Sequence, residues 1–221
     1  MQPARDDLFT LMHKALRLEL FGVTTTAAAL DWTDDGSVRP FVDRWHALVE
    51  LLHLHSRHED RHFFTLAERK APGATSPLSE QHVVQGRALD AVNDAVEAAV
   101  KGDEAATVHR RIAMFVGAYL PHLDTEERQV MPLLWATCSD AELAEVRAGF
   151  MAETPPEMGA LSMRLMLPAV TPGERAAIVG MVRATAPPPV VDNLLHTAAQ
   201  VLSPVDYARL TADTGAPPPG A

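Results

Sequence analysis

Apolar residues recur every three or four positions through roughly the first 135 residues, which is the spacing of one face of a helix. The stretches DWTDDGS, APGATSP and KGD interrupt this pattern. The pattern predicts four long helices, over about residues 6–30, 38–70, 76–100 and 103–135. Asp6 or Asp7 can cap the first of them, and Ser76 followed by Pro77 is a good start for the third. Because the connections are short, we expect an all-α fold, an antiparallel up-and-down four-helix bundle.

The pattern changes after Cys138. Ser139 with Glu142, and Thr171 with Glu174, have the spacing of a capping box, which marks the start of a helix. Five shorter C-terminal helices are predicted, over about residues 140–152, 157–167, 172–185, 188–202 and 204–212. The chain is therefore divided into a bundle over 1–137, a helical extension packed on it over 138–212, and a disordered tail over 213–221.

Composition narrows the classes of function. The single cysteine, Cys138, excludes an internal disulfide framework and a thiolate-based metal site within one chain, and it suits a reducing cytoplasm. The formal net charge of −10 repels phosphate backbones and anionic lipid surfaces, so we expect neither nucleic acid nor a membrane as a partner. The acidic start, MQPARDDLF, does not resemble a signal peptide. A cytoplasmic protein is expected.

Two of the ten histidines open copies of an internal repeat. The segments HSRHEDRHFFTL, from His55, and HLDTEERQVMPLL, from His122, both contain histidine, three residues, glutamate, an acid and arginine. Residues four apart lie on one face of a helix. His55 with Glu59, and His122 with Glu126, therefore each present an imidazole and a carboxylate in one direction. Each pair is half of a candidate metal site.

The other two long helices each carry one histidine at a matching place. His13 lies 42 residues before His55, and His82 lies 40 residues before His122. Two helix pairs related by an approximate two-fold axis would bring four imidazoles and two carboxylates to the middle of one bundle. Such a set suits two iron ions bridged by the carboxylates, with two manganese ions as the alternative. The candidate metal ligands are His13, His55, Glu59, His82, His122 and Glu126.

This pattern of histidines and glutamates, with an acid after each glutamate, resembles the hemerythrin-like, or HHE cation-binding, domain. The resemblance covers about residues 6–136. It implies an antiparallel four-helix bundle with a non-haem di-iron centre that binds or reacts with dioxygen, peroxide or nitric oxide. It also implies that the six candidate residues have the metal-ligand roles of that family.

The sequence departs from the oxygen-carrying hemerythrins at several places. Those proteins have a second histidine four residues after the ligand on the third helix, where this chain has Gly86. The missing imidazole would leave one iron with an open or water-filled position, which suits chemistry better than reversible oxygen carriage. Glu126 replaces the final aspartate ligand at a spacing one residue shorter, and His62 and Gln129 stand where an apolar residue is usual. The leading hypothesis is a di-iron oxidoreductase, an oxidase, oxygenase or peroxide-consuming enzyme, whose organic substrate, if it has one, the sequence does not specify.

Other interpretations remain open. The alternative function is a non-enzymatic module that senses or stores oxygen, nitric oxide or iron. A third is a purely structural bundle, in which the histidines are hydrogen-bonded core residues. His62 is an alternative ligand or a hydrogen-bond partner of the site, because it follows Glu59 by three residues. Tyr119, one turn before His122, is the candidate catalytic residue, because it could donate a proton or a hydrogen bond to a bound oxygen species. A packed aromatic ring is the competing interpretation of Tyr119.

Overall fold

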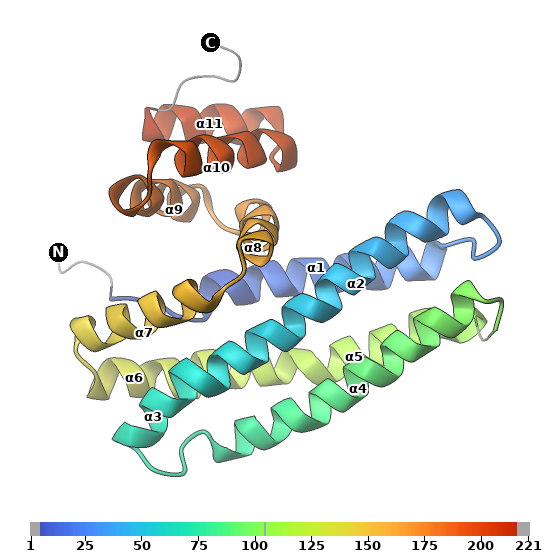
Figure 1. The fold of residues 1–221 in the computed structure, drawn as a ribbon, viewed down its shortest axis with the longest axis horizontal. Coiled ribbons are helices and arrows are strands. Elements are labelled where there is room, and N and C mark those ends of the chain that lie inside the picture. The colour runs from blue at the N-terminus through green and yellow to red at the C-terminus, as the bar shows by residue number, and fades with distance from the viewer. Residues whose placement is uncertain (1–4, 104, 216–221) are drawn as a thin grey trace. The chain divides into compact units, whose positions relative to one another are not determined.

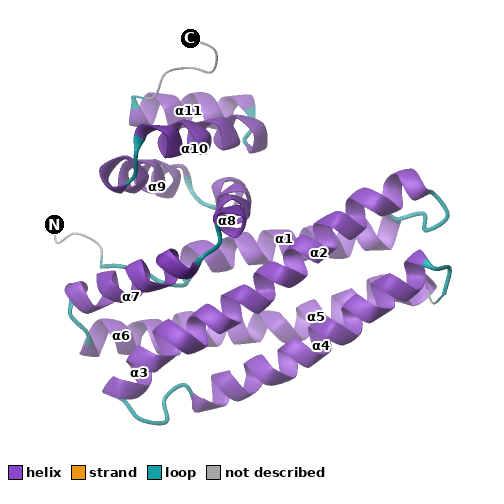
Figure 2. Cartoon of the chain, in the orientation of Figure 1, coloured by secondary structure: helices purple, strands orange, loops and turns teal. Residues whose placement is uncertain are grey.

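A computed structural model describes residues 5–103 and 105–215. Every regular element in these ranges is a helix, and no strand occurs in them (Figure 2). The α-helices are α1 (Thr10–Ala29), α2 (Asp35–His58), α3 (Thr65–Lys70), α4 (Ser76–Val100), α5 (Ala105–Thr125), α6 (Met131–Thr137), α7 (Asp140–Glu153), α8 (Pro156–Ala169), α9 (Pro172–Thr185), α10 (Pro188–Val201) and α11 (Pro204–Thr214). Two π-helical segments, η1 (Glu59–Phe64) and η2 (Glu126–Val130), join α2 to α3 and α5 to α6.

The contacts between residues divide the chain into two compact units. The first comprises the described residues within 1–10 and 19–154, and the second those within 11–18 and 155–221. This division falls after Thr154, later than the boundary expected after residue 137. α7 therefore belongs to the first unit.

In the first unit, α2 packs along α4, and α4 packs along α5 (Figure 1). Trp45 of α2 is fully buried, and its indole N–H donates a hydrogen bond to the side-chain oxygen of Asn93 on α4 at 3.1 Å. Arg44 donates two hydrogen bonds to the carboxylate of Glu19, at 2.6 and 2.8 Å. Such bidentate pairs fix geometry as well as contributing energy. These contacts hold α2 against its neighbours within the first unit.

The long helices begin close to the predicted positions, with three corrections. α1 begins at Thr10 rather than near residue 6, because the carboxylate of Asp7 accepts hydrogen bonds from the backbone N–H groups at Phe9 and Thr10. α2 begins at Asp35, within a stretch expected to be a loop, and Asp34 caps it. Ser76 is the first residue of α4 rather than its cap, a position that Thr75 occupies.

Two helices predicted to be continuous contain a π-helical turn. The turns begin at Glu59 and at Glu126, the glutamates of the two repeat copies. After η2, the backbone N–H of Met131 donates to the carbonyl of Glu126, five residues earlier, as π-helical bonding requires. Each turn inserts a residue into the helical pattern, so the buried face shifts after the glutamate. The apolar periodicity of the sequence did not predict these turns, which occur frequently at functional sites.

One hydrophobic cluster packs around the two π turns. Its buried members include Phe63 and Phe64 of η1 and Val130 of η2, together with Leu143 of α7. Cys138, at the end of α6, is buried in the same cluster, as the structural interpretation of this residue predicts. α7 is thus one part of the predicted extension that packs against the segment carrying Glu59.

The second unit contains four C-terminal helices that begin at regular intervals. α8, α9, α10 and α11 each start at a proline, at residues 156, 172, 188 and 204, which repeat every 16 residues. Proline suits the first helical position, because its missing N–H would be unsatisfied there in any case. The four starts were predicted separately, but their common period was not recognised.

The capping boxes at Ser139 and Thr171 are confirmed by hydrogen bonds in both directions with Glu142 and Glu174. α11 ends at Thr214, so the first two residues of the tail predicted to be disordered over 213–221 are helical. Residues 216–221 lie outside the described part of the chain.

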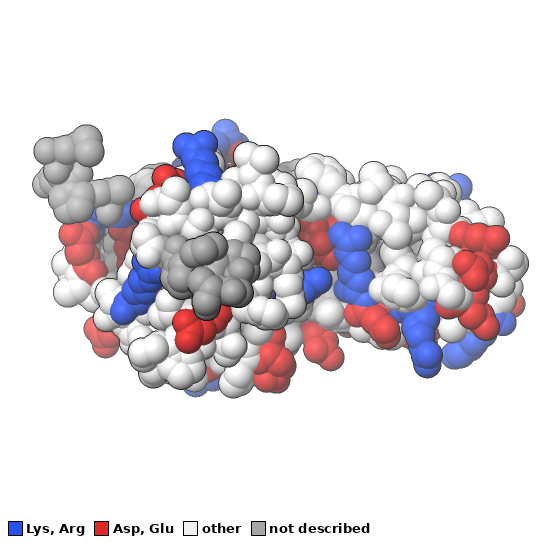
Figure 3. Space-filling view, turned by 90° about the horizontal axis from the view of Figure 1, so that it is seen from above, with Lys and Arg blue, Asp and Glu red and all other residues white. Residues whose placement is uncertain are grey.

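The helices of the described residues lack the combination of length and hydropathy needed to cross a membrane. On the face shown in Figure 3, acidic and basic side chains are interspersed among uncharged ones. The described part of that face therefore has no continuous basic surface of the kind that follows a nucleic-acid backbone.

Candidate metal centre

The six candidate ligands come from the long helices and are almost completely removed from solvent. His13 lies on α1, His55 on α2, His82 on α4 and His122 on α5, while Glu59 and Glu126 are the first residues of η1 and η2. Glu59, Glu126 and His13 are 0% exposed. Burying an ionised carboxylate is costly without compensating positive charge. The environment therefore calls for a cation.

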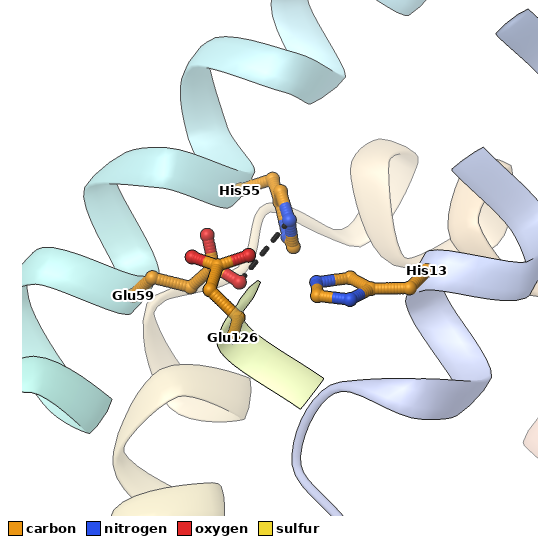
Figure 4. Close-up of side chains that lie close together, drawn as sticks. All are labelled: His13, His55, Glu59 and Glu126. Atoms are coloured by element: carbon orange, nitrogen blue, oxygen red, sulfur yellow. Dashed lines mark ion pairs between the residues drawn. The ribbon is translucent and has the colours of Figure 1, made fainter. Parts of the chain in front are cut away.

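The structure brings four of these residues into one group, His13, His55, Glu59 and Glu126. One ligand atom from each lies within 4.8 Å of those from the other three. Figure 4 shows both imidazoles turned toward the two carboxylates, with Nε2 of His55 3.2 Å from Oε1 of Glu59. The His-x3-Glu spacing thus acts as the helical geometry predicts.

A second group, Glu59, His82, His122 and Glu126, lies wholly within the first unit. Nε2 of His122 is 3.1 Å from Oε1 of Glu126. Nε2 of His82 lies 3.5 Å from Oε2 of Glu59 and 3.5 Å from Oε1 of Glu126. The two groups therefore share both glutamates, and each adds two histidines of its own.

The histidines of the second group present free lone pairs toward the glutamates. Among the described residues, Nε2 of His82 and Nε2 of His122 are buried and have no hydrogen-bond partner. Nδ1 of His122 lies 2.9 Å from Oε1 of Gln81, an acceptor, so this nitrogen carries the proton and donates it. That tautomer leaves Nε2 unprotonated. Histidines that bind metals are oriented in this way, so the donor set fits a metal cation.

Asp60 holds the other ring nitrogen of His82. Oδ1 of Asp60 is 3.1 Å from Nδ1 of His82 and also accepts a hydrogen bond from the hydroxyl of Ser79 at 2.7 Å. The ring of Phe64 stacks on the imidazole, with centroids 5.3 Å apart and planes 2° apart. Sequence analysis identified neither Asp60 nor Gln81 as a partner. The acid after each glutamate in the repeat was the signal that pointed to Asp60.

The surrounding carboxylates make His82 strongly basic in the metal-free protein. Burial opposes the charged imidazolium, but hydrogen bonds to Asp60 and to the two shared glutamates outweigh burial and raise the pKa of His82 to about 11. An entering cation must displace this proton, because only the neutral imidazole binds a metal. Cation binding and proton release are coupled at this position.

Replacing Asp60 with asparagine tests its contact with His82. We expect the affinity for ferrous iron to fall by about 10-fold to 100-fold, the usual effect of removing a partner that orients a ligand. Competition with a coloured chelator would measure the change. Asp94→Asn, an exposed position on α4, is the matched control. Equal affinities in the two variants would contradict the role of Asp60.

Tyr119 lies deep in the first unit beside the second group. It is 3% exposed, its ring centroid is 6.0 Å from that of His122, and its buried hydroxyl has no hydrogen-bond partner in the described residues. Burial, reinforced by the charges of Glu59 and Glu126, raises the pKa of Tyr119 well above its ordinary value. The phenol therefore stays protonated and keeps its capacity to donate. Its catalytic role stays a prediction.

The remaining histidines have other partners. Nε2 of His62 is 3.1 Å from Oε2 of Glu153 on α7, and His62 belongs to neither metal group. His46 and His53 pair with acids on α4, Glu97 at 2.6 Å and Asp90 at 2.9 Å. These contacts match the prediction that His46 and His53 are surface or structural residues.

Comparison with known proteins supports this assignment of the ligands' chemistry. A family model described as the hemerythrin HHE cation-binding domain matches residues 5–144. The matched range includes both metal groups and α7 through its first turn. Comparisons with curated proteins and with solved structures returned no match.

Proposed function

Because the chain belongs to the hemerythrin HHE cation-binding domain family, we propose that it is a non-haem di-iron protein that reacts with dioxygen or peroxide. In this proposal, α1, α2 with α3, α4, and α5 with α6 form an antiparallel four-helix bundle around the ions. The family and the His/Glu groups support cation binding. The number of ions, their identity as iron rather than manganese, and the reaction are the proposal's own steps.

One observation carries the proposal: two groups of potential ligands share Glu59 and Glu126. A carboxylate has two oxygens, so a buried glutamate that belongs to both groups can bridge two ions. His13 and His55 would hold one ion, and His82 and His122 the other. Four imidazoles and two carboxylates suit iron in such a bundle.

The chain's own residues hold and shield the centre. Iron bound there would supply redox chemistry and Lewis acidity toward a small oxygen species. Asp60 and Gln81 orient the imidazoles of His82 and His122 by contacting their outer ring nitrogens. Gly86, one turn after His82 on α4, offers no side chain to the ion. We infer that fewer protein ligands than the oxygen carriers possess leaves a position where a small molecule reacts.

Metal content and reactivity, measured in sequence, test the proposal. The protein is reconstituted anaerobically with ferrous iron, desalted, and analysed for iron per chain. We expect about two irons per chain, the number that two groups with shared carboxylates require. Oxygen uptake and peroxide loss are then followed with the loaded protein and with the metal-free protein.

The outcomes separate the candidate functions. Iron-dependent loss of oxygen or peroxide would support an enzymatic reaction. A protein with two irons that leaves both reagents untouched would favour sensing or storage instead. Iron close to zero in a protein that keeps its helices, as measured by circular dichroism, would contradict the di-iron proposal.

A further inference from the structure

A small cavity lies between α2, α4 and α5, beside the second metal group. Its lining includes His82, Gln85, Gly86 and Tyr119, together with apolar side chains such as Leu89 and Phe115. About 10 Å³ is open to the centre of a water molecule, which is close to the room that one buried water needs. The cavity lies within the first unit and touches His82 directly.

Two polar atoms of the lining are buried without hydrogen bonds. Within the described part of the chain, the hydroxyl of Tyr119 and Oε1 of Gln85 have no partner. Leaving a buried polar group unpaired costs roughly 1–3 kcal/mol. Two such atoms on one cavity of this size indicate a bound molecule that pairs with both. An apolar occupant would leave the cost in place.

The two atoms specify the chemistry of that molecule. The phenol of Tyr119 donates a hydrogen bond, and Oε1 of Gln85 accepts one. The occupant must therefore accept at one side and donate at the other, and it must fit the space of about one heavy atom. Water and hydroxide meet all three conditions.

Gly86 makes this space. A Cβ added at Gly86 would meet one atom within 4 Å, Cε1 of His53 at 3.8 Å, which is an ordinary contact. The backbone therefore tolerates a side chain here, and the absence of one is not required by close packing. A larger residue at this position would extend toward the cavity that Gly86 lines.

We propose that this cavity holds a water or hydroxide ligand next to the ion bound by His82 and His122, with Tyr119 and Gln85 as its hydrogen-bond partners. The inference rests on the proposed metal centre. Tyr119 and Gln85 are positioning residues that select a ligand of about one heavy atom at the position left open beside Gly86.

Fluoride is the probe, because it has the size of hydroxide, accepts hydrogen bonds and has no proton to donate. Its affinity for the ferric, iron-loaded full-length protein is measured by titration calorimetry, beside iron content for every variant. Tyr119→Phe is expected to weaken fluoride binding by about 10-fold or more, because a hydrogen bond to a charged group is lost. Gln85→Met is expected to strengthen it by a factor of about 2 to 10, because only the displaced water loses its acceptor.

Changes at Gly86 test the place of the ligand. Gly86→His adds an imidazole beside the cavity and is expected to abolish fluoride binding, and Gly86→Ala, a smaller change, is expected to weaken it. Gly117→His, on α5 where a Cβ meets nothing within 4 Å, is the matched control and should bind fluoride as the parent protein does. Tyr207→Phe is the control for Tyr119→Phe, since Tyr207 belongs to the second unit.

Two kinds of failure are distinguishable. If the parent protein takes up no iron, the proposed function fails, and this inference fails with it. If iron content is normal but Tyr119→Phe and both Gly86 variants bind fluoride like the parent, the ligand binds elsewhere and only this inference is overturned. Weakened binding in Gln85→Met would likewise overturn the assignment of Gln85 as acceptor.

Discussion

Replacing Glu59 with alanine is expected to reduce the metal content from about two ions per chain to nearly none, while the helices remain. Glu59 belongs to both ligand groups and is 0% exposed. Its loss removes an anionic ligand from each ion at once, and neither group then keeps more than one carboxylate. The charge of the remaining ligands no longer offsets the cost of taking a divalent cation out of water.

Elemental analysis after anaerobic iron loading measures this effect, and circular dichroism checks that the helices are intact. Glu50→Ala, an exposed glutamate on the same helix α2, is the matched control and should bind iron normally. Glu59→Gln separates charge from shape, because the amide keeps the volume of the side chain. Normal iron content in Glu59→Ala would mean that the internal repeat does not mark the metal site.

Replacing Arg175 with alanine is expected to destabilise the second unit by about 2–4 kcal/mol. Arg175 is 7% exposed, and its Nε–H donates to the carbonyl of Leu167 at 2.7 Å. That carbonyl lies in the last turn of α8, where no backbone N–H of the helix can reach it. Nη1 of Arg175 also donates to Asp206 of α11 at 2.8 Å. The substitution leaves a buried carbonyl unpaired and breaks this link between helices.

Hydrogen exchange measured by mass spectrometry locates the effect. Amides of α8, α9 and α11 should exchange faster by the factor that corresponds to the lost free energy, about 30-fold to 1,000-fold when exchange follows opening of this unit. Arg164→Ala, an exposed arginine on α8, is the control. Unchanged exchange in Arg175→Ala would show that these hydrogen bonds contribute little to the stability of the second unit.

The same arginine contact also has a pH dependence. Hydrogen bonding from Arg175 is the largest cause that lowers the pKa of Asp206 below its ordinary value. A carboxyl whose pKa is lower in the folded state stabilises the fold above its unfolded pKa and loses that contribution as the pH falls through the folded one. Asp206 is exposed enough for solvent to screen this contribution.

The helix positions and the ligand set were predictable because they depend on local spacing. A histidine and a glutamate four residues apart share a helix face whatever the rest of the fold does. The matching offsets of His13 and His82 then pointed to the helices that complete the groups. Capping boxes at Ser139 and Thr171 are likewise local, and they lie where they were predicted.

The π turns at Glu59 and Glu126 were not predictable from periodicity. An inserted residue shifts a helical pattern by one position, and a short apolar pattern cannot distinguish this shift from ordinary variation. The regular starts of α8 to α11 were visible in the sequence but were found one at a time. The helical residues at 213 and 214 were missed because polar composition favoured disorder.

The sequence by itself determined the chemistry of this protein: an all-helical chain with histidines and glutamates spaced to hold a cation. Tertiary structure decided how that chemistry is tuned. Asp60 reaches His82, Gln81 reaches His122, and Tyr119 and Gln85 line one cavity beside Gly86, and each of these pairs joins different helices. Such contacts depend on the distance and rotation between packed helices, which the spacing of residues along one helix does not encode.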